Sequence, residues 1–142
     1  MRFVGCIIVG LVLAGCDALG VPPIAMECPA MGCDSQVVFE LQRNLDPGET
    51  YDVEACVDDR CFTAEVTVSE HGFAMRNELV LDGDQVVLVL PAGDYRGTRR
   101  VSLALRGPRG ESTDIETETE FARVQPNGEQ CEPTCWQATI DV

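Results

Sequence analysis

Apolar and polar residues alternate along most of the chain after residue 35, and no stretch repeats its apolar residues with the period of a helix. Because successive side chains of a β-strand point to opposite faces, this alternation predicts strands that bury one face. Clusters of Gly, Pro and Asp divide the chain into seven or eight such segments. We therefore expect an all-β fold.

The predicted strands are short and separated by turn signals. Most of them alternate, whereas residues 86–90 are apolar throughout, which indicates a strand covered on both faces. Such a series is typical of an antiparallel two-sheet sandwich of immunoglobulin-like or transthyretin-like type. The strands are expected at residues 36–43, 51–57, 60–68, 86–90, 98–106, 115–121 and 135–142, with a further segment that contains Met75 and Leu79. The expected core residues are Phe39, Val53, Phe62, Val66, Leu88, Leu103, Phe121, Trp136 and Ile140.

Two cysteines flank a predicted hairpin turn at Asp58-Asp59. A two-residue turn there places Cys56 opposite Cys61, and it also aligns the apolar residues of the two strands. The cysteines lie one step beyond the pair that closes the turn, so they form a non-hydrogen-bonded pair with Cα atoms about 4.5 Å apart. A disulfide bridges that separation. The sequence therefore predicts a Cys56–Cys61 disulfide.

Residues 1–15 begin with a basic tip at Arg2, continue as a short apolar run and end on small residues. This order is typical of a secretory signal peptide. The run is too short for a transmembrane helix, which needs about 20 apolar residues. We therefore expect the chain to be exported and residues 1–15, with Cys6 among them, to be removed.

The cleavage region reads Leu13-Ala14-Gly15-Cys16, an aliphatic residue and two small residues before a cysteine. This resembles the lipobox of bacterial lipoproteins. The resemblance implies cleavage before Cys16, diacylglycerol on the Cys16 sulfur and, optionally, acylation of the freed amine. Two or three acyl chains hold a protein stably on a bilayer. It therefore implies a lipid anchor on the extracytoplasmic face of a cell membrane. The Gly- and Pro-bearing residues 16–35 would form the tether, and residues 36–142 the domain.

Six cysteines remain once Cys6 and Cys16 are set aside. An even number in an exported chain implies disulfides. For the two outer pairs the sequence leaves two arrangements open, local pairing or crossed pairing between the tether and the C-terminal loop. Crossed pairing would close larger rings, which stabilise more in the chain-entropy model. The six are Cys28, Cys33, Cys56, Cys61, Cys131 and Cys135.

Few residues suggest catalysis or metal binding. His71 is the only histidine, and it lies in a predicted loop with no nucleophile motif in the chain, so we expect no enzyme. Asp82-Gly83-Asp84 has the acid spacing at the start of a Ca²⁺ loop but not the rest of the pattern. The Met and Cys side chains of residues 26–33 would bind Cu(I) if reduced. We expect no metal and no cofactor beyond the lipid, with Ca or Cu handling as the alternative function.

The chain is strongly acidic, with a formal net charge of −14. This charge disfavours nucleic acid as a partner. The alternating Glu116, Glu118 and Glu120 predict the solvated face of an edge or outer strand. The favoured function is a non-enzymatic binding or structural module of the cell envelope, whose loops contact an envelope protein, a glycan or an extracellular ligand.

Overall fold

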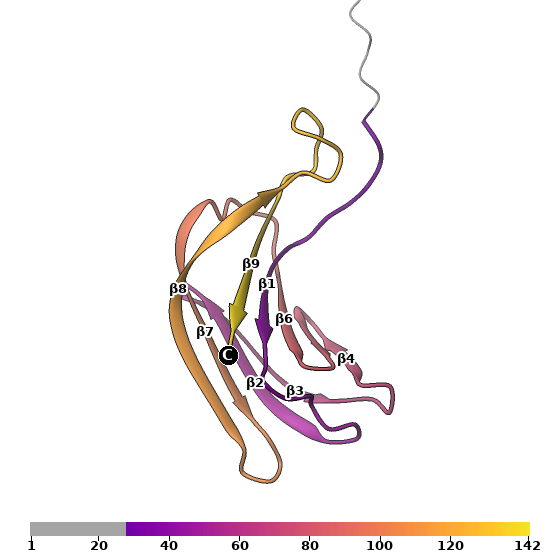
Figure 1. Cartoon of the computed structure of the whole chain (residues 1–142), viewed down its shortest axis with the longest axis vertical. Helices are drawn as coiled ribbons and strands as arrows, with labels where there is room; N and C mark the ends of the chain where they lie inside the picture. The colour runs from indigo at the N-terminus through magenta and orange to yellow at the C-terminus, as the bar shows by residue number, and fades with distance from the viewer. Residues whose placement is uncertain (1–27) are drawn as a thin grey trace, which may run out of the picture.

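A computed structural model describes residues 28–142, and their regular structure is β-strand with no helix (Figure 1). The all-β prediction is therefore confirmed. The predicted signal peptide, Cys16 and the first part of the predicted tether lie outside the described residues. The strands are β1 (Ser35–Glu40), β2 (Thr50–Val57), β3 (Arg60–Thr67), β4 (Phe73–Arg76), β5 (Leu79–Asp82), β6 (Gln85–Leu90), β7 (Gly97–Arg106), β8 (Ser112–Val124) and β9 (Cys135–Asp141).

The nine strands form one sheet in the order β3-β2-β7-β8-β9-β1-β6-β5-β4. Its two end strands, β3 and β4, contact each other, so the sheet is nearly closed into a barrel. Neighbouring strands are antiparallel except β1 and β9, which pair in parallel from Gln36 with Gln137 to Glu40 with Asp141. The prediction of a wholly antiparallel sheet is wrong for this pair. Its two strands are far apart in the sequence, and alternation looks the same for either direction.

Strand β8 connects the two halves of the sheet. Its residues 112–121 pair with β7, and its last three, Ala122 to Val124, pair with β9. A strand that changes partner in this way turns the sheet through a corner. The core lies inside the curved sheet, where the inward residues of both halves meet.

The core contains the residues that alternation selected, with two exceptions. Seven of the nine expected core side chains are buried, whereas Phe62 and Trp136 are half-buried at its margin. The prediction that residues 86–90 are covered on both faces is wrong in part. Val86, Leu88 and Leu90 are buried, but the intervening valines on the other face are half-buried.

The β2–β3 hairpin has the predicted register. Cys56 lies opposite Cys61, and the two form a disulfide with Cα atoms 4.1 Å apart. Asp58 occupies the first turn position at φ 52°. Its backbone N–H donates to the Arg100 carbonyl at 2.8 Å, and its carboxylate accepts from the Arg100 N–H at 3.2 Å. These bonds to β7 give a reason for Asp at a turn position that usually holds Asn or Gly.

The barrel has two different ends (Figure 1). At one end, which we call the clasp end, residues 28–34 meet the loop 125–134 between β8 and β9. At the opposite end, which we call the tip, the loops 41–49 and 107–111 are joined by an ion pair between Asp46 and Arg109. The two hollows described next lie at the clasp end.

Candidate functional site

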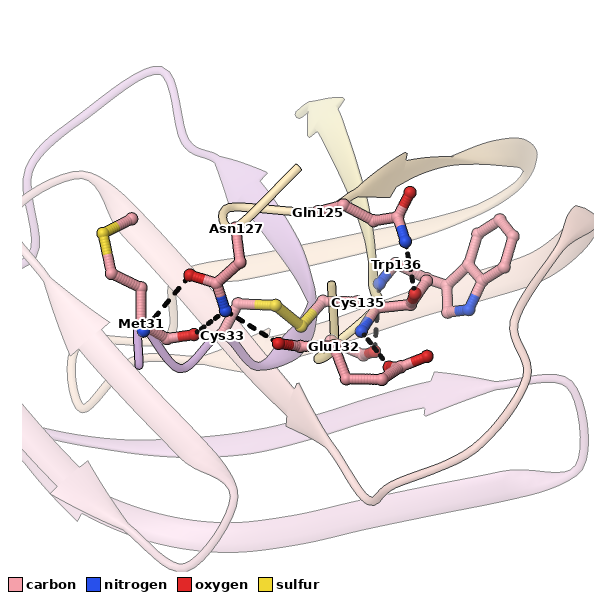
Figure 2. Close-up of a disulfide and its surroundings, with 9 residues drawn as sticks. Met31, Cys33, Gln125, Asn127, Glu132, Cys135 and Trp136 are labelled. Carbon is pink, nitrogen blue, oxygen red and sulfur yellow. Dashed lines mark hydrogen bonds between the residues drawn. A yellow bond between two sulfur atoms is a disulfide. The ribbon is translucent and has the colours of Figure 1, made fainter. Parts of the chain in front are cut away.

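Two crossed disulfides hold the clasp end together. Cys28 bonds to Cys131 at a sequence separation of 103 residues. Cys33 bonds to Cys135 at a separation of 102 residues (Figure 2). Of the two arrangements that the sequence left open, the structure therefore has the crossed one. Residues 28–34, which the sequence assigned to the tether, are bonded covalently to the loop before β9 and to the first residue of β9.

Asn127 adds hydrogen bonds between the same two segments (Figure 2). Its amide nitrogen donates to the carbonyls of Met31 and Glu132, both at 2.8 Å. Its side-chain oxygen accepts from the Met31 N–H at 3.2 Å. The side chain thus satisfies both backbone groups of Met31, as a strand partner would. We call residues 28–33 and 125–135 together the clasp.

A hollow of about 510 Å³ lies beside the clasp, and we call it the Trp136 groove. Arg123 and Trp136 are directly opposite each other in the β8–β9 ladder, so their side chains share a face. Arg123 follows the buried Phe121 by two residues, and Trp136 precedes the buried Ala138 by two. Both therefore continue the core face beyond the edge of the core, at the mouth of the barrel. The groove is lined by Gly93, Asp94, Arg96, Arg123, Glu132, Thr134 and Trp136.

The two carboxylates of the Trp136 groove are engaged by neighbours on their own loops. Asp94 accepts from Arg96 Nε at 2.7 Å and from the Arg96 backbone N–H at 3.1 Å. These hydrogen bonds lower the pKa of Asp94, and the Asp94 carboxylate raises the pKa of Arg96. Glu132 accepts from the Thr134 N–H at 2.9 Å. Within residues 28–142 the Arg123 guanidinium and the Trp136 indole N–H have no hydrogen-bond partner, so the groove has donors available to a ligand.

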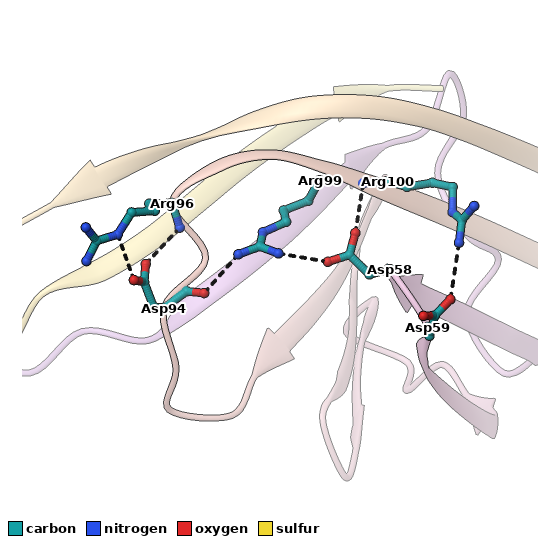
Figure 3. Close-up of polar contacts among 6 residues, drawn as sticks. All are labelled: Asp58, Asp59, Asp94, Arg96, Arg99 and Arg100. Atoms are coloured by element: carbon teal, nitrogen blue, oxygen red, sulfur yellow. Dashed lines mark hydrogen bonds and ion pairs between the residues drawn. The ribbon is translucent and has the colours of Figure 1, made fainter.

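A second hollow, of about 520 Å³, lies on the other side of the loop 91–96. Arg99 at its wall donates to the Asp58 carboxylate and to the Asp94 carbonyl, both at 3.2 Å (Figure 3). The Arg99 Nε is buried and has no partner within the described residues. Asp94 is therefore held through its carboxylate by Arg96 and through its carbonyl by Arg99. The loop between the two hollows is braced from both sides.

The other candidate residues lie away from the clasp. His71 is exposed in the loop between β3 and β4, inside a tight turn in which the Gly72 N–H donates to the Ser69 carbonyl at 2.9 Å. In the Asp82-Gly83-Asp84 segment, Asp82 is the last residue of β5, and Gly83 and Asp84 form the turn to β6, with Gly83 at φ 60°. In residues 28–142 no three His, Cys, Asp or Glu side chains gather where they could hold a metal ion. Glu116, Glu118 and Glu120 are exposed, as predicted.

Sequence reasoning assigned Trp136 to the core and did not select Arg123. The signal that could have found them is weak. Trp136 has the alternation expected of a core residue. It is half-buried because β9 begins at the barrel mouth, where the core ends. Cys135 was expected on the face opposite Trp136, which it occupies, but it is buried because it bonds to Cys33.

The comparisons with known proteins give no relative for this chain: no family model, curated protein or solved structure matches it. Residues 28–142 contain no helix with the length and apolar character needed to cross a bilayer.

Proposed function

We propose that this chain is a membrane-anchored extracytoplasmic lipoprotein whose disulfide-bonded domain acts as a non-enzymatic binding module of the cell envelope. One observation carries the proposal. All six cysteines of residues 28–142 pair with one another, which leaves Cys16 as the only cysteine after Gly15 outside these disulfides. Disulfides persist in exported proteins and are rare in reducing compartments. An acylated Cys16 would have no thiol to pair.

The position of the clasp supports an anchor on the N-terminal side. The clasp fixes Cys28 to the body of the domain, so a pull on the chain from Cys16 would reach the domain through two covalent bonds instead of peeling β1 from its sheet. Residues 17–27 could extend by about 40 Å at most, at roughly 3.3 to 3.6 Å per residue. In this proposal the clasp end faces the membrane and the tip points away from it.

Binding instead of catalysis is favoured by what the clasp end presents. Asp94 and Glu132 accept hydrogen bonds from neighbours on their own loops, and the loop 91–96 is braced. Arg123 and Trp136 lie opposite each other on paired strands, so their backbone positions are fixed beside the groove. Hydrogen-bond donors beside an aromatic side chain in a hollow suit recognition of a ligand.

The proposal includes an immunoglobulin-like or transthyretin-like arrangement of the domain. The support is strand β8, which divides its pairing between β7 and β9 and so separates two ladders that cover one core. Sandwiches with corner strands have this feature. A solved structure in which the two halves of the sheet form a closed barrel without a break at β8 would contradict it.

The anchor is tested by metabolic labelling with an alkyne fatty acid in an exporting bacterial host. Wild-type protein is expected in the membrane fraction, and its label should remain bound after washing at neutral pH and boiling in detergent. Cys16→Ser should remove the label and abolish cleavage before residue 16. The matched control is Cys6→Ser, which lies in the predicted signal peptide and should leave labelling unchanged. Equal labelling of Cys16→Ser and wild type would overturn the proposal.

A further inference from the structure

The Trp136 groove combines an aromatic side chain, two guanidinium groups and a hydroxyl at the mouth of the barrel. Trp136 is half-buried, so part of its indole contacts the core and part lines the groove. Arg123 lies directly opposite it in the β8–β9 ladder, and the Arg96 side chain is 74% exposed. Barrel mouths are common places for small-molecule sites, and a volume of about 510 Å³ lies in the usual range for them.

Arg123 is one of four arginines in residues 28–142 that form no ion pair with a carboxylate, and it is the one of these four that lines the Trp136 groove. The chain has a net charge of −14, and five of the arginines in the described residues form ion pairs with carboxylates. Arg123 forms none within residues 28–142, although acids are abundant and Glu132 lines the same groove. Glu132 accepts instead from the Thr134 N–H. The groove therefore contains a cation whose five N–H donors have no hydrogen-bond partner among residues 28–142.

The free groups of the groove define the ligand they would bind. A guanidinium binds a carboxylate through two parallel hydrogen bonds, and charge-assisted bonds of this kind are stronger than neutral ones. An indole offers an apolar surface with a single donor, which suits a ring that is apolar on one face and polar at its edge. A pyranose ring has that character, because its C–H bonds gather on a face and its hydroxyls on the rim.

We propose that the Trp136 groove binds carboxylated saccharides, with Arg123 on the carboxylate and Trp136 against the sugar ring. Arg96 lines the same groove, and its two terminal guanidinium nitrogens, which are not used in the bond to Asp94, donate to a second oxygen of the ligand. The braced loop 91–96 forms one wall, and the clasp forms the other. The inference rests on the proposed function only in that an exported domain meets such saccharides outside the cell.

The groove carries its own reporter, because Trp136 is the only tryptophan of the chain. The test is a fluorescence titration of the purified mature protein with tetragalacturonate, with the uncharged cellotetraose and acetate as comparison ligands. We expect a saturable change with tetragalacturonate and affinity for cellotetraose and for acetate that is weaker by about tenfold or more.

Two matched arginine variants distinguish a specific contact of Arg123 with the ligand from the effect of removing one positive charge. Arg123→Gln should weaken tetragalacturonate binding by about tenfold or more, whereas Arg43→Gln, an exposed arginine at the tip, should change it by less than about twofold. Trp136→Phe should also weaken tetragalacturonate binding. Because this variant lacks the only tryptophan, its binding is measured by calorimetry, and its folding is checked by circular dichroism.

Three results would overturn the saccharide site: no saturable signal up to about 10 mM ligand, equal affinity for acetate, or equal loss in the two arginine variants. The titration does not depend on the lipid, and the labelling experiment does not depend on the saccharide. Failure of one inference is therefore distinguishable from failure of the other.

Discussion

The two disulfides of the clasp should stabilise the domain in a strongly non-additive way. Either bond alone closes a ring of about 100 residues, which the chain-entropy model values at about 4.7 kcal/mol. With one bond intact, the other closes only a small ring through residues 28–33 and 131–135, about 11 residues, worth about 2.8 kcal/mol. Breaking either bond should therefore cost about 2.8 kcal/mol, and breaking both about 7.5 kcal/mol.

The perturbation is made with cysteine-to-alanine pairs. Cys28→Ala with Cys131→Ala removes one bond, Cys33→Ala with Cys135→Ala removes the other, and the four changes together remove both. The free energy of unfolding is measured by urea titration. The m-value, which is the slope of this free energy against urea concentration, should be the same for all variants. We expect the four-residue variant to lose about 2 kcal/mol more than the two pair variants lose in sum.

The Cys56–Cys61 pair provides the control. Its ring lies within one hairpin and does not change size when the clasp is opened, so its removal should cost about 2 kcal/mol with or without the clasp. Strict additivity of the two clasp bonds would refute the reasoning, because it would mean that they do not share one large ring. A combined loss no greater than that of one pair would refute it equally.

Two further predictions concern the hydrogen bonds of the clasp end. Asn127→Ala removes three hydrogen bonds and should lower the free energy of unfolding by about 1 to 3 kcal/mol in urea titrations. Asn127→Asp sets a carboxylate oxygen against the carbonyls of Met31 and Glu132 and should lower it at least as much; wild-type stability of either variant would contradict this. Asp94 has a pKa below its usual 3.8, so its ionised form stabilises the fold above that pH and this contribution is lost as the pH falls through the lowered pKa. Asp94→Asn should therefore be less stable than wild type at pH 7, with a smaller difference at pH 3; an unchanged or larger difference would contradict the assignment.

Local features of the fold were predictable because neighbouring residues decide them. The β2–β3 hairpin has the predicted register because a two-residue turn fixes every pair that follows, down to Cys56 with Cys61. The anionic face of β8 was predictable for the same reason, since alternation alone exposes its glutamates.

Features that join distant parts of the chain were not predictable. The β1–β9 pair is parallel because the two strands enter the sheet from the same end. The sequence of neither strand indicates the direction of its partner. The crossed disulfides likewise depend on residues 28–33 lying beside the loop before β9. Trp136 has the alternation of a core residue, and its role in the groove comes from where its strand begins relative to the barrel mouth.

The central claim is that an oxidised domain is held on a membrane through Cys16, and intact mass tests it most directly. Protein extracted from membranes is weighed before and after reduction. The account predicts a chain that begins at Cys16, an added mass of two or three acyl chains with glycerol, and a gain of about six mass units on reduction, two for each of the three disulfides. A mass that retains residues 1–15, lacks acyl chains or shows no gain on reduction would contradict it.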